Sequence, residues 1–124
     1  MRKNVVIQEP LAPKGKPVKS SSAPTFDPFI ENVYRIIDEH YSEPDFGVEQ
    51  LSVLLDMSRS QLYRKVKSLT GMTPFDMIRD KRQYMAQQLI AEGMPLEKVA
   101  NSVGYSSTAY FVKCYEEYQN LAES

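Results

Sequence analysis

From residue 27 onward, hydrophobic residues recur every three or four positions, in runs separated by glycine, proline and short polar segments. This spacing predicts amphipathic α-helices that each bury one face. We therefore expect an all-α fold. Its helices should span residues 28–41, 48–55, 58–70, 74–92 and 96–103, and a last helix should run through residue 118.

The stretch from Val48 to Gly71 predicts two short helices joined by a tight turn. In the second of these helices Leu62, Val66 and Leu69 fall at i, i+4 and i+7, which places them on one buried stripe. A different stripe of the same helix carries polar and cationic side chains, namely Ser60, Tyr63, Arg64 and Lys67. We expect this helix to pack through one face and to present the other to a partner.

Local signals indicate where the helices begin and end. Ser58 and Gln61 have the spacing of a capping box, in which two side chains bond the free backbone N–H groups of the first turn. Gly71 is expected just after the end of that helix. Further N-caps are expected at Asp27, at Thr73 and at either Ser106 or Ser107.

The other helices also have candidate inward faces. The first helix offers Phe29, Ile30, Val33, Tyr34, Ile36 and Ile37, and the second offers Val48, Leu51, Leu54 and Leu55. The long helix offers Phe75, Ile78, Met85, Ala86, Leu89 and Ile90, and the last offers Tyr110, Phe111, Cys114, Tyr115 and Tyr118. These side chains are the expected core.

An internal repeat accompanies these helices. The sequence VEQL at 48–51 recurs as LEKV at 96–99, an offset of 48 residues. At an offset of 49 residues, Ser58, Leu62, Arg64, Val66 and Leu69 recur as Ser107, Phe111, Lys113, Tyr115 and Tyr118. The repeat predicts two helix-turn-helix units joined by the long helix, which at 1.5 Å per residue is roughly 28 Å long.

The formal net charge is only −1, but charge is segregated along the chain. Residues 26–56 carry a net charge of −7, residues 57–82 carry +5 and residues 83–124 carry −3. Positive charge is therefore concentrated on the helix at 58–70 and the start of the next helix. This distribution favours a one-sided contact with a polyanion such as DNA, which the acidic flanks weaken.

Candidate catalytic and metal-binding chemistry is sparse. Cys114 is the only cysteine and His40 the only histidine, so no metal-ligand cluster with a recognisable spacing is present. The sequence contains no Gly-rich phosphate loop and no nucleophile elbow. We therefore expect neither an enzyme nor a bound cofactor. A lone cysteine and the lack of an apolar N-terminal segment favour a reduced, cytoplasmic setting.

Residues 1–25 differ from the rest, because they contain four prolines, a run of serines and a net charge of +4. This composition indicates a flexible linker or tail. A tether to an upstream segment is the simpler interpretation, and a basic arm that touches phosphates is the alternative.

With these features together, the sequence resembles the AraC-type (AraC/XylS) DNA-binding domain of bacterial transcription regulators, over roughly residues 27–118. The resemblance rests on Ser58, Leu62, Arg64, Lys67, Gly71, Arg82, Ala86, Leu89, Val99, Ala100, Gly104, Tyr105, Tyr110, Phe111, Lys113 and Tyr115. The run DFGVEQLSVLLDMSRSQLYRKVKSLTGMTP further resembles the output domain at the C-terminal end of hybrid two-component sensor regulators. The resemblance implies sequence-specific binding of double-stranded DNA for transcription regulation, with an upstream receiver or sensor domain and RNA polymerase as further partners.

The resemblance also implies roles for individual residues. The second helix of each unit would enter the major groove, and successive groove faces lie about 34 Å apart. In the first unit the base-facing residues would be Ser60, Tyr63 and Arg64, and the phosphate contacts would be Arg59, Lys65 and Lys67. Arg64 is the expected bidentate partner of a guanine. In the second unit the corresponding positions are Thr108, Ala109, Val112 and Lys113.

The second unit departs from the family pattern. Glu116 and Glu117 replace basic residues, and residues 119–124 replace the usual terminal helix, so the unit resembles a truncated one. We expect boundaries at 1–25 for the linker or tail, 26–72 for the first unit, 73–93 for the linker helix and 94–124 for the second unit.

The same residues are compatible with other functions. A degenerate helical module that binds a protein partner without specific DNA binding is the main alternative, favoured by Glu116 and Glu117. Arg79 would be either a solvated charge or a DNA contact, and Lys81 would either have a structural role or contact DNA. Arg82 would either pair with acidic residues of a neighbouring helix or contact DNA.

Overall fold

The computed structural model describes residues 27–123, and side chains are described to residue 121. The expected linker at residues 1–25 lies outside the described residues. The described part is all-helical, in the order α1 (Pro28–His40), α2 (Val48–Leu54), α3 (Arg59–Thr70), α4 (Pro74–Ala91), α5 (Leu96–Ser102) and α6 (Thr108–Glu123). The expected fold class is confirmed. The last helix extends five residues beyond the predicted end at residue 118.

The helix starts follow the local capping chemistry. Asp27 accepts a hydrogen bond from the backbone N–H of Phe29 at 2.8 Å, with Pro28 in the first helical turn. Thr73 and Asp76 form a reciprocal capping box at the start of α4, with distances of 3.0 and 3.1 Å. Because these bonds involve near neighbours in sequence, they could be predicted without any tertiary information.

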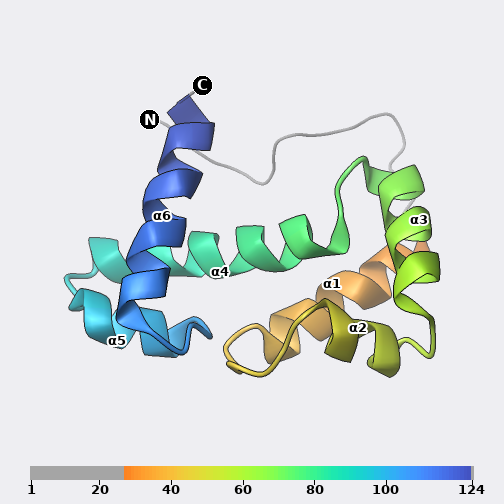
Figure 1. The fold of residues 1–124 in the computed structure, drawn as a ribbon, viewed down its shortest axis with the longest axis horizontal. Coiled ribbons are helices and arrows are strands. Elements are labelled where there is room, and N and C mark those ends of the chain that lie inside the picture. The colour runs from red at the N-terminus through yellow and green to blue at the C-terminus, as the bar shows by residue number, and fades with distance from the viewer. Residues whose placement is uncertain (1–26, 124) are drawn as a thin grey trace.

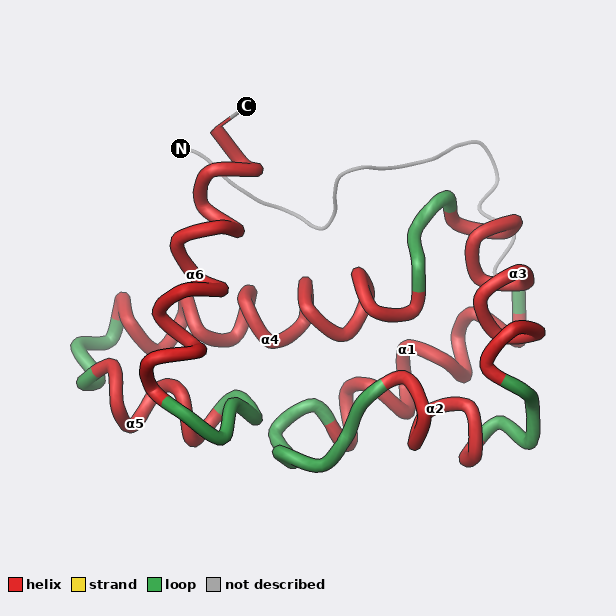
Figure 2. The backbone as a smooth tube through the Cα atoms, viewed as in Figure 1, coloured by secondary structure: helices red, strands yellow, loops and turns green. Residues whose placement is uncertain are grey.

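The long helix α4 connects two groups of helices. In Figure 1, α4 crosses the view, with α3 near one of its ends and α6 near the other, and these two helices run roughly parallel to each other. Figure 2 shows that only short loops join the helices. At 1.5 Å per residue the 18 residues of α4 span about 27 Å.

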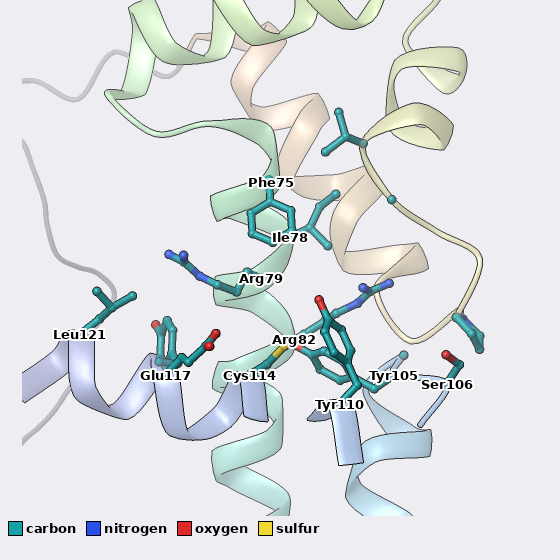
Figure 3. A pocket seen from close by; sticks show the side chains of 15 residues that line it. Phe75, Ile78, Arg79, Arg82, Tyr105, Ser106, Tyr110, Cys114, Glu117 and Leu121 are labelled. Carbon is teal, nitrogen blue, oxygen red and sulfur yellow. The ribbon is translucent and has the colours of Figure 1, made fainter. Parts of the chain in front are cut away.

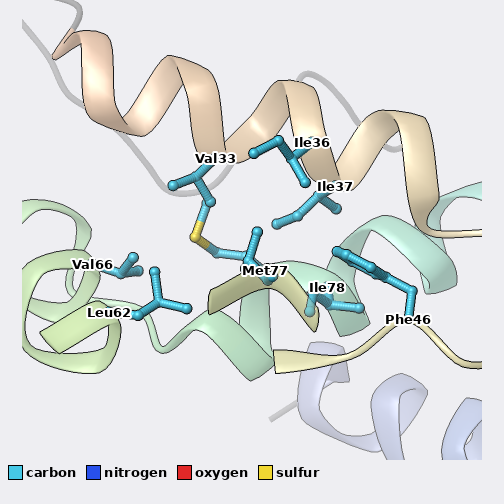
Figure 4. Packing of buried hydrophobic residues seen from close by; sticks show 9 residues of the cluster. Val33, Ile36, Ile37, Phe46, Leu62, Val66, Met77 and Ile78 are labelled. Carbon is cyan, nitrogen blue, oxygen red and sulfur yellow. The ribbon is translucent and has the colours of Figure 1, made fainter. Parts of the chain in front are cut away.

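Two hydrophobic cores lie on α4. The first core consists of buried side chains from α1, α2, α3, the α1–α2 loop and the N-terminal half of α4: Val33, Ile36, Ile37, Phe46, Leu51, Leu62, Val66, Met77 and Ile78. Figure 4 shows Met77 between α1 and α3, close to Val33 and Leu62. The second core consists of Ala86, Val99, Ala100, Val103, Tyr105 and Phe111. We call the elements around each core the first and the second unit.

Each unit has a turn before its last helix, and the two turns have the same backbone geometry. Asp56 has a φ of 57° and Gly104, 48 residues later, has a φ of 94°. After these residues Met57 donates to the carbonyl of Ser52 at 3.0 Å and Tyr105 donates to the carbonyl of Ala100 at 2.9 Å, again 48 residues apart. The sequence repeat therefore corresponds to a repeated backbone geometry.

Several expected core positions are wrong. Leu69 is 45% exposed, Leu54 51% and Phe75 58%, and Tyr34 and Tyr110 are also exposed. Each lies on the apolar stripe of its helix, but the neighbouring elements leave about half of its surface exposed. Conversely, the polar Gln83 of α4 is fully buried, where its amide donates to the hydroxyl of Tyr105 at 2.9 Å.

Candidate nucleic-acid interface

The orientation of α3 is determined at its first turn and along one face. Ser58 accepts a hydrogen bond from the backbone N–H of Gln61 at 3.1 Å, and Gln61 accepts one from the backbone N–H of Ser58 at 2.9 Å. Leu62 and Val66 are fully buried in the first core. Because a helix rotates by about 100° per residue, burial of these two residues turns the opposite side of α3 toward solvent.

Every predicted contact residue on α3 is exposed: Arg59, Ser60, Tyr63, Arg64, Lys65 and Lys67. Arg64 follows Leu62 by two residues and precedes Val66 by two, so its side chain points away from the core. Within the described residues, the side chains of Arg59 and Arg64 make no hydrogen bond and no ion pair. Two guanidinium groups are therefore available to an incoming anion or base edge.

The two lysines of α3 are held by contacts within the protein. The Lys65 ammonium lies 4.4 Å from the centre of the Phe29 ring at the start of α1. The Lys67 ammonium donates to the carbonyl of Gly71 at 3.1 Å, where it caps the end of its own helix. Both remain exposed, so they add positive charge to the edges of the face that Arg64 occupies.

Ser68 belongs to the same exposed face, although sequence reasoning did not include it. It lies four residues after Arg64, so the two side chains are neighbours on the helix surface. The signal that could have found it is helical spacing alone, since Ser60, Arg64 and Ser68 are separated by four residues each.

The second unit places α6 in the same way but with different chemistry. Ser107 is its N-cap, because its hydroxyl accepts from the backbone N–H of Tyr110 at 3.0 Å, and Phe111 is fully buried where α3 has Leu62. The exposed face then carries Ala109, Lys113, Glu116 and Glu117, while Thr108 and Val112 are half-buried. This face has one cation beside two carboxylates.

The cations of α4 are engaged inside the protein. Arg79 pairs with Asp76 and Asp80 of its own helix, at 3.4 and 3.0 Å. Lys81 pairs with Asp38 of α1. Arg82 donates to backbone carbonyls of the α1–α2 loop, so the alternative in which it pairs with acidic side chains of a neighbouring helix is wrong.

Metal sites and membrane-spanning helices are absent from the described part of the chain. Within residues 27–121, no group of three or more histidine, cysteine, aspartate or glutamate side chains could hold a metal ion. None of the helices in the described part of the chain is long and apolar enough to cross a bilayer.

Comparison with known proteins agrees with this geometry. Residues 51–122, which run from α2 into α6, match the family described as a helix-turn-helix domain. The chain belongs to the AraC-type helix-turn-helix family. The expected class, a helix-turn-helix DNA-binding domain of the kind found in transcription regulators, is confirmed.

Solved AraC-type structures show the same arrangement of helices. The C-terminal domain of the two-component response regulator yesN from Fusobacterium nucleatum superposes with a TM-score of 0.73 at 26% identity, covering 76% of this chain and 92% of that one. The DNA-binding domain of AdpA, in complex with a target DNA, superposes with a TM-score of 0.64 at 30% identity, covering 74% and 82%.

Curated relatives of this AraC-type domain are much longer proteins. Histidine kinase P4 of Formosa agariphila is 28% identical over 96 residues, which are 77% of this chain and 7% of that protein. The chain spans less than half the length of each curated relative that it matches.

Proposed function

We propose that this chain is a bipartite reader of double-stranded DNA, in which α3 and α6 enter successive major-groove segments on one side of the duplex. The observation that carries the proposal is the outward face of α3, where Arg64 projects away from the buried Leu62 and has no partner within the described residues. The neighbouring residues give this face a positive charge. The AdpA domain, solved with its target DNA, supports the same use of the fold.

The proposed roles follow the chemistry of each side chain. Arg64 would bond guanine O6 and N7, which is worth about 1–3 kcal/mol of discrimination against another base. Ser60 and Tyr63 would contact base edges beside it, while Arg59, Lys65 and Lys67 would bond phosphates, which position the protein without reading sequence. Lys113 and Thr108 would make the corresponding contacts from α6.

The wider setting is also part of the proposal. Similarity to a histidine kinase and to a response-regulator output domain supports a role as the output module of a signalling regulator, with a receiver or sensor domain upstream. We propose that it works in the bacterial cytoplasm without catalytic activity of its own, and that RNA polymerase is a further partner. The proposed division is 1–25, 26–72, 73–93 and 94–124.

Selection of bound oligonucleotides tests this function. The full chain is expected to enrich duplexes with two short blocks about one helical turn apart. Its affinity for the selected duplex should fall with salt, with a log–log slope of about −3 to −4.5 for roughly three to five neutralised phosphates. Enrichment of a single block would contradict the bipartite reader.

The second candidate is a module that binds a protein partner. It is favoured by the acidic pair Glu116 and Glu117 on α6 and by Val53 and Leu54, which are exposed on α2. If the chain enriches no sequence and binds every duplex with equal, weak affinity, this candidate replaces the DNA reader.

A further inference from the structure

Arg82 lies where the two units meet. Its guanidinium donates to three backbone carbonyls of the α1–α2 loop: those of Tyr41 at 2.8 Å, Glu43 at 3.1 Å and Phe46 at 2.8 Å. These acceptors are 36 to 41 residues away in sequence. The bonds therefore connect the middle of the long helix to a loop of the first unit.

The same guanidinium also lies close to the second unit. It lies 5.8 Å from the centre of the Tyr105 ring, and Figure 3 shows Arg82 leaving α4 with Tyr105 beside it. A Cβ on Gly104 would lie 2.2 Å from the Tyr41 carbonyl oxygen and 2.9 Å from Arg82 Nε. The backbones of the two units thus approach so closely that only glycine fits between the loop and Arg82.

The position of Arg82 along α4 has a simple geometric meaning. Ile78, Arg82 and Ala86 are separated by four residues each, so they lie on one stripe of the helix. Ile78 is buried in the first core and Ala86 in the second. Arg82 is the residue at which this stripe passes from one unit to the other.

We propose that Arg82 is a positioning residue that holds α3 and α6 at a fixed separation, and that it thereby sets the spacing between the two DNA blocks the protein reads. This inference rests on the proposed DNA-reading function. When α3 and α6 are held at the distance that separates the two blocks, binding of the second block is intramolecular, which raises the affinity. When the two helices are loosely held, this gain in affinity is lost. The planar guanidinium reaches several carbonyls at once, which the single ammonium of lysine cannot do in the same geometry.

The first test measures the separation of α3 and α6 without DNA. Spin labels are attached to cysteines replacing Ser68 and Glu116, both exposed, in a chain that carries Cys114→Ser. The electron–electron distance distribution should be narrow in this background and about twofold broader in Arg82→Met and Arg82→Lys. Arg35→Met is the matched control, because it removes one positive charge from an exposed pair on α1 and should leave the distribution unchanged. Equal widths in all four proteins would overturn the proposal.

The second test uses the selected two-block duplex with one to five base pairs added to or removed from its spacer. The parent chain should show one optimal spacer. Arg82→Met and Arg82→Lys should lose about tenfold affinity at that spacer and bind the other spacers as before. An affinity loss that is equal at every spacer would contradict the proposal. So would parent-like affinity and parent-like salt dependence in Arg82→Lys, because both results would make Arg82 a phosphate contact.

The two tests separate the inference from the function on which it rests. If no two-block duplex is enriched, the DNA reader fails, while the distance distribution still decides whether Arg82 holds the units together. Far-UV circular dichroism of each variant distinguishes unfolding of the protein from loss of the contacts that Arg82 makes. If Arg82→Met does not fold, both experiments use Arg82→Lys, which keeps the positive charge and the aliphatic part of the side chain.

Discussion

Asp56 and Gly104 occupy the same place in the two turns of this chain and share a left-handed backbone, but they differ in what surrounds them. Asp56 is exposed, with a φ of 57°. Gly104 is buried, with a φ of 94°, against the carbonyl of Tyr41. One turn tolerates a side chain and the other does not.

Substitutions at these two turns should therefore differ in their effect on stability. Gly104→Ala should lower the free energy of unfolding by about 1–3 kcal/mol, because it adds strain at positive φ and a clash with the Tyr41 carbonyl. Asp56→Gly should change it by less than about 1 kcal/mol, since aspartate visits this region readily and glycine adds chain entropy to the unfolded state. Urea unfolding followed by circular dichroism measures both, and equal losses would contradict this account of the junction.

Leu62 and Leu69 belong to one sequence stripe but should contribute unequally to stability. Leu62→Ala should cost about 2–5 kcal/mol, because it opens a cavity in the first core. Leu69→Ala, at a position that is 45% exposed, should cost less than about 1 kcal/mol. The same unfolding experiment compares them. A large loss at Leu69 would show that this side chain is covered in solution.

These positions show which features of the fold can be predicted from the sequence. Capping pairs such as Ser58 with Gln61 were predictable, because their bonds join residues three apart. Burial of Leu69 and Phe75 was predicted wrongly, since periodicity identifies an apolar stripe but not where the neighbouring helices stop covering it.

Some features of the candidate site and of the contacts between the two units could likewise be predicted from the sequence, and others could not. The exposed position of Arg64 followed from the spacing of Leu62 and Val66, which are in its own helix. The partners of Arg82 could not be predicted, because carbonyl acceptors carry no sequence signal and lie in a loop about 40 residues away.

The acidic pair on α6 should weaken DNA binding. Replacing Glu116 and Glu117 by glutamine removes two like charges from beside the DNA, so affinity for any duplex should rise about threefold to tenfold at low salt. Fluorescence anisotropy at several salt concentrations measures the change, which should shrink as salt increases.

The matched control removes two carboxylates elsewhere. Glu31→Gln with Glu92→Gln lowers the net negative charge equally at exposed positions on α1 and at the end of α4. If this pair raises affinity as much as the α6 pair does, only net charge matters, and α6 does not lie beside the duplex.

Stability should fall at alkaline pH because of Tyr118. Burial, with a smaller contribution from the Asp80 carboxylate, raises the pKa of Tyr118 to about 12, and the Arg79 guanidinium partly opposes this. An unfolded tyrosine ionises near pH 10. Between about pH 10 and 12 the unfolded state therefore binds fewer protons than the native state, so the free energy of unfolding decreases as pH rises.

Thermal unfolding at pH 9 and pH 11 tests this prediction. Between pH 9 and pH 11 the melting temperature of Tyr118→Phe should fall less than that of the parent protein, because phenylalanine has no proton to release. Tyr84→Phe, at an exposed position of α4, is the control and should behave like the parent. Equal losses in all three proteins would mean that Tyr118 is accessible to solvent.

The central claim is that α3 reads bases through Arg64, and base preference at single positions of the selected duplex tests it most directly. Arg64→Ala should abolish the preference for guanine at one base pair, a loss of about 1–3 kcal/mol, and leave the other positions unchanged. Lys67→Ala should weaken binding to every sequence alike and lower the salt slope by about one. If Arg64→Ala leaves the guanine preference intact, or if both variants weaken all sequences equally, α3 does not read DNA in the way proposed here.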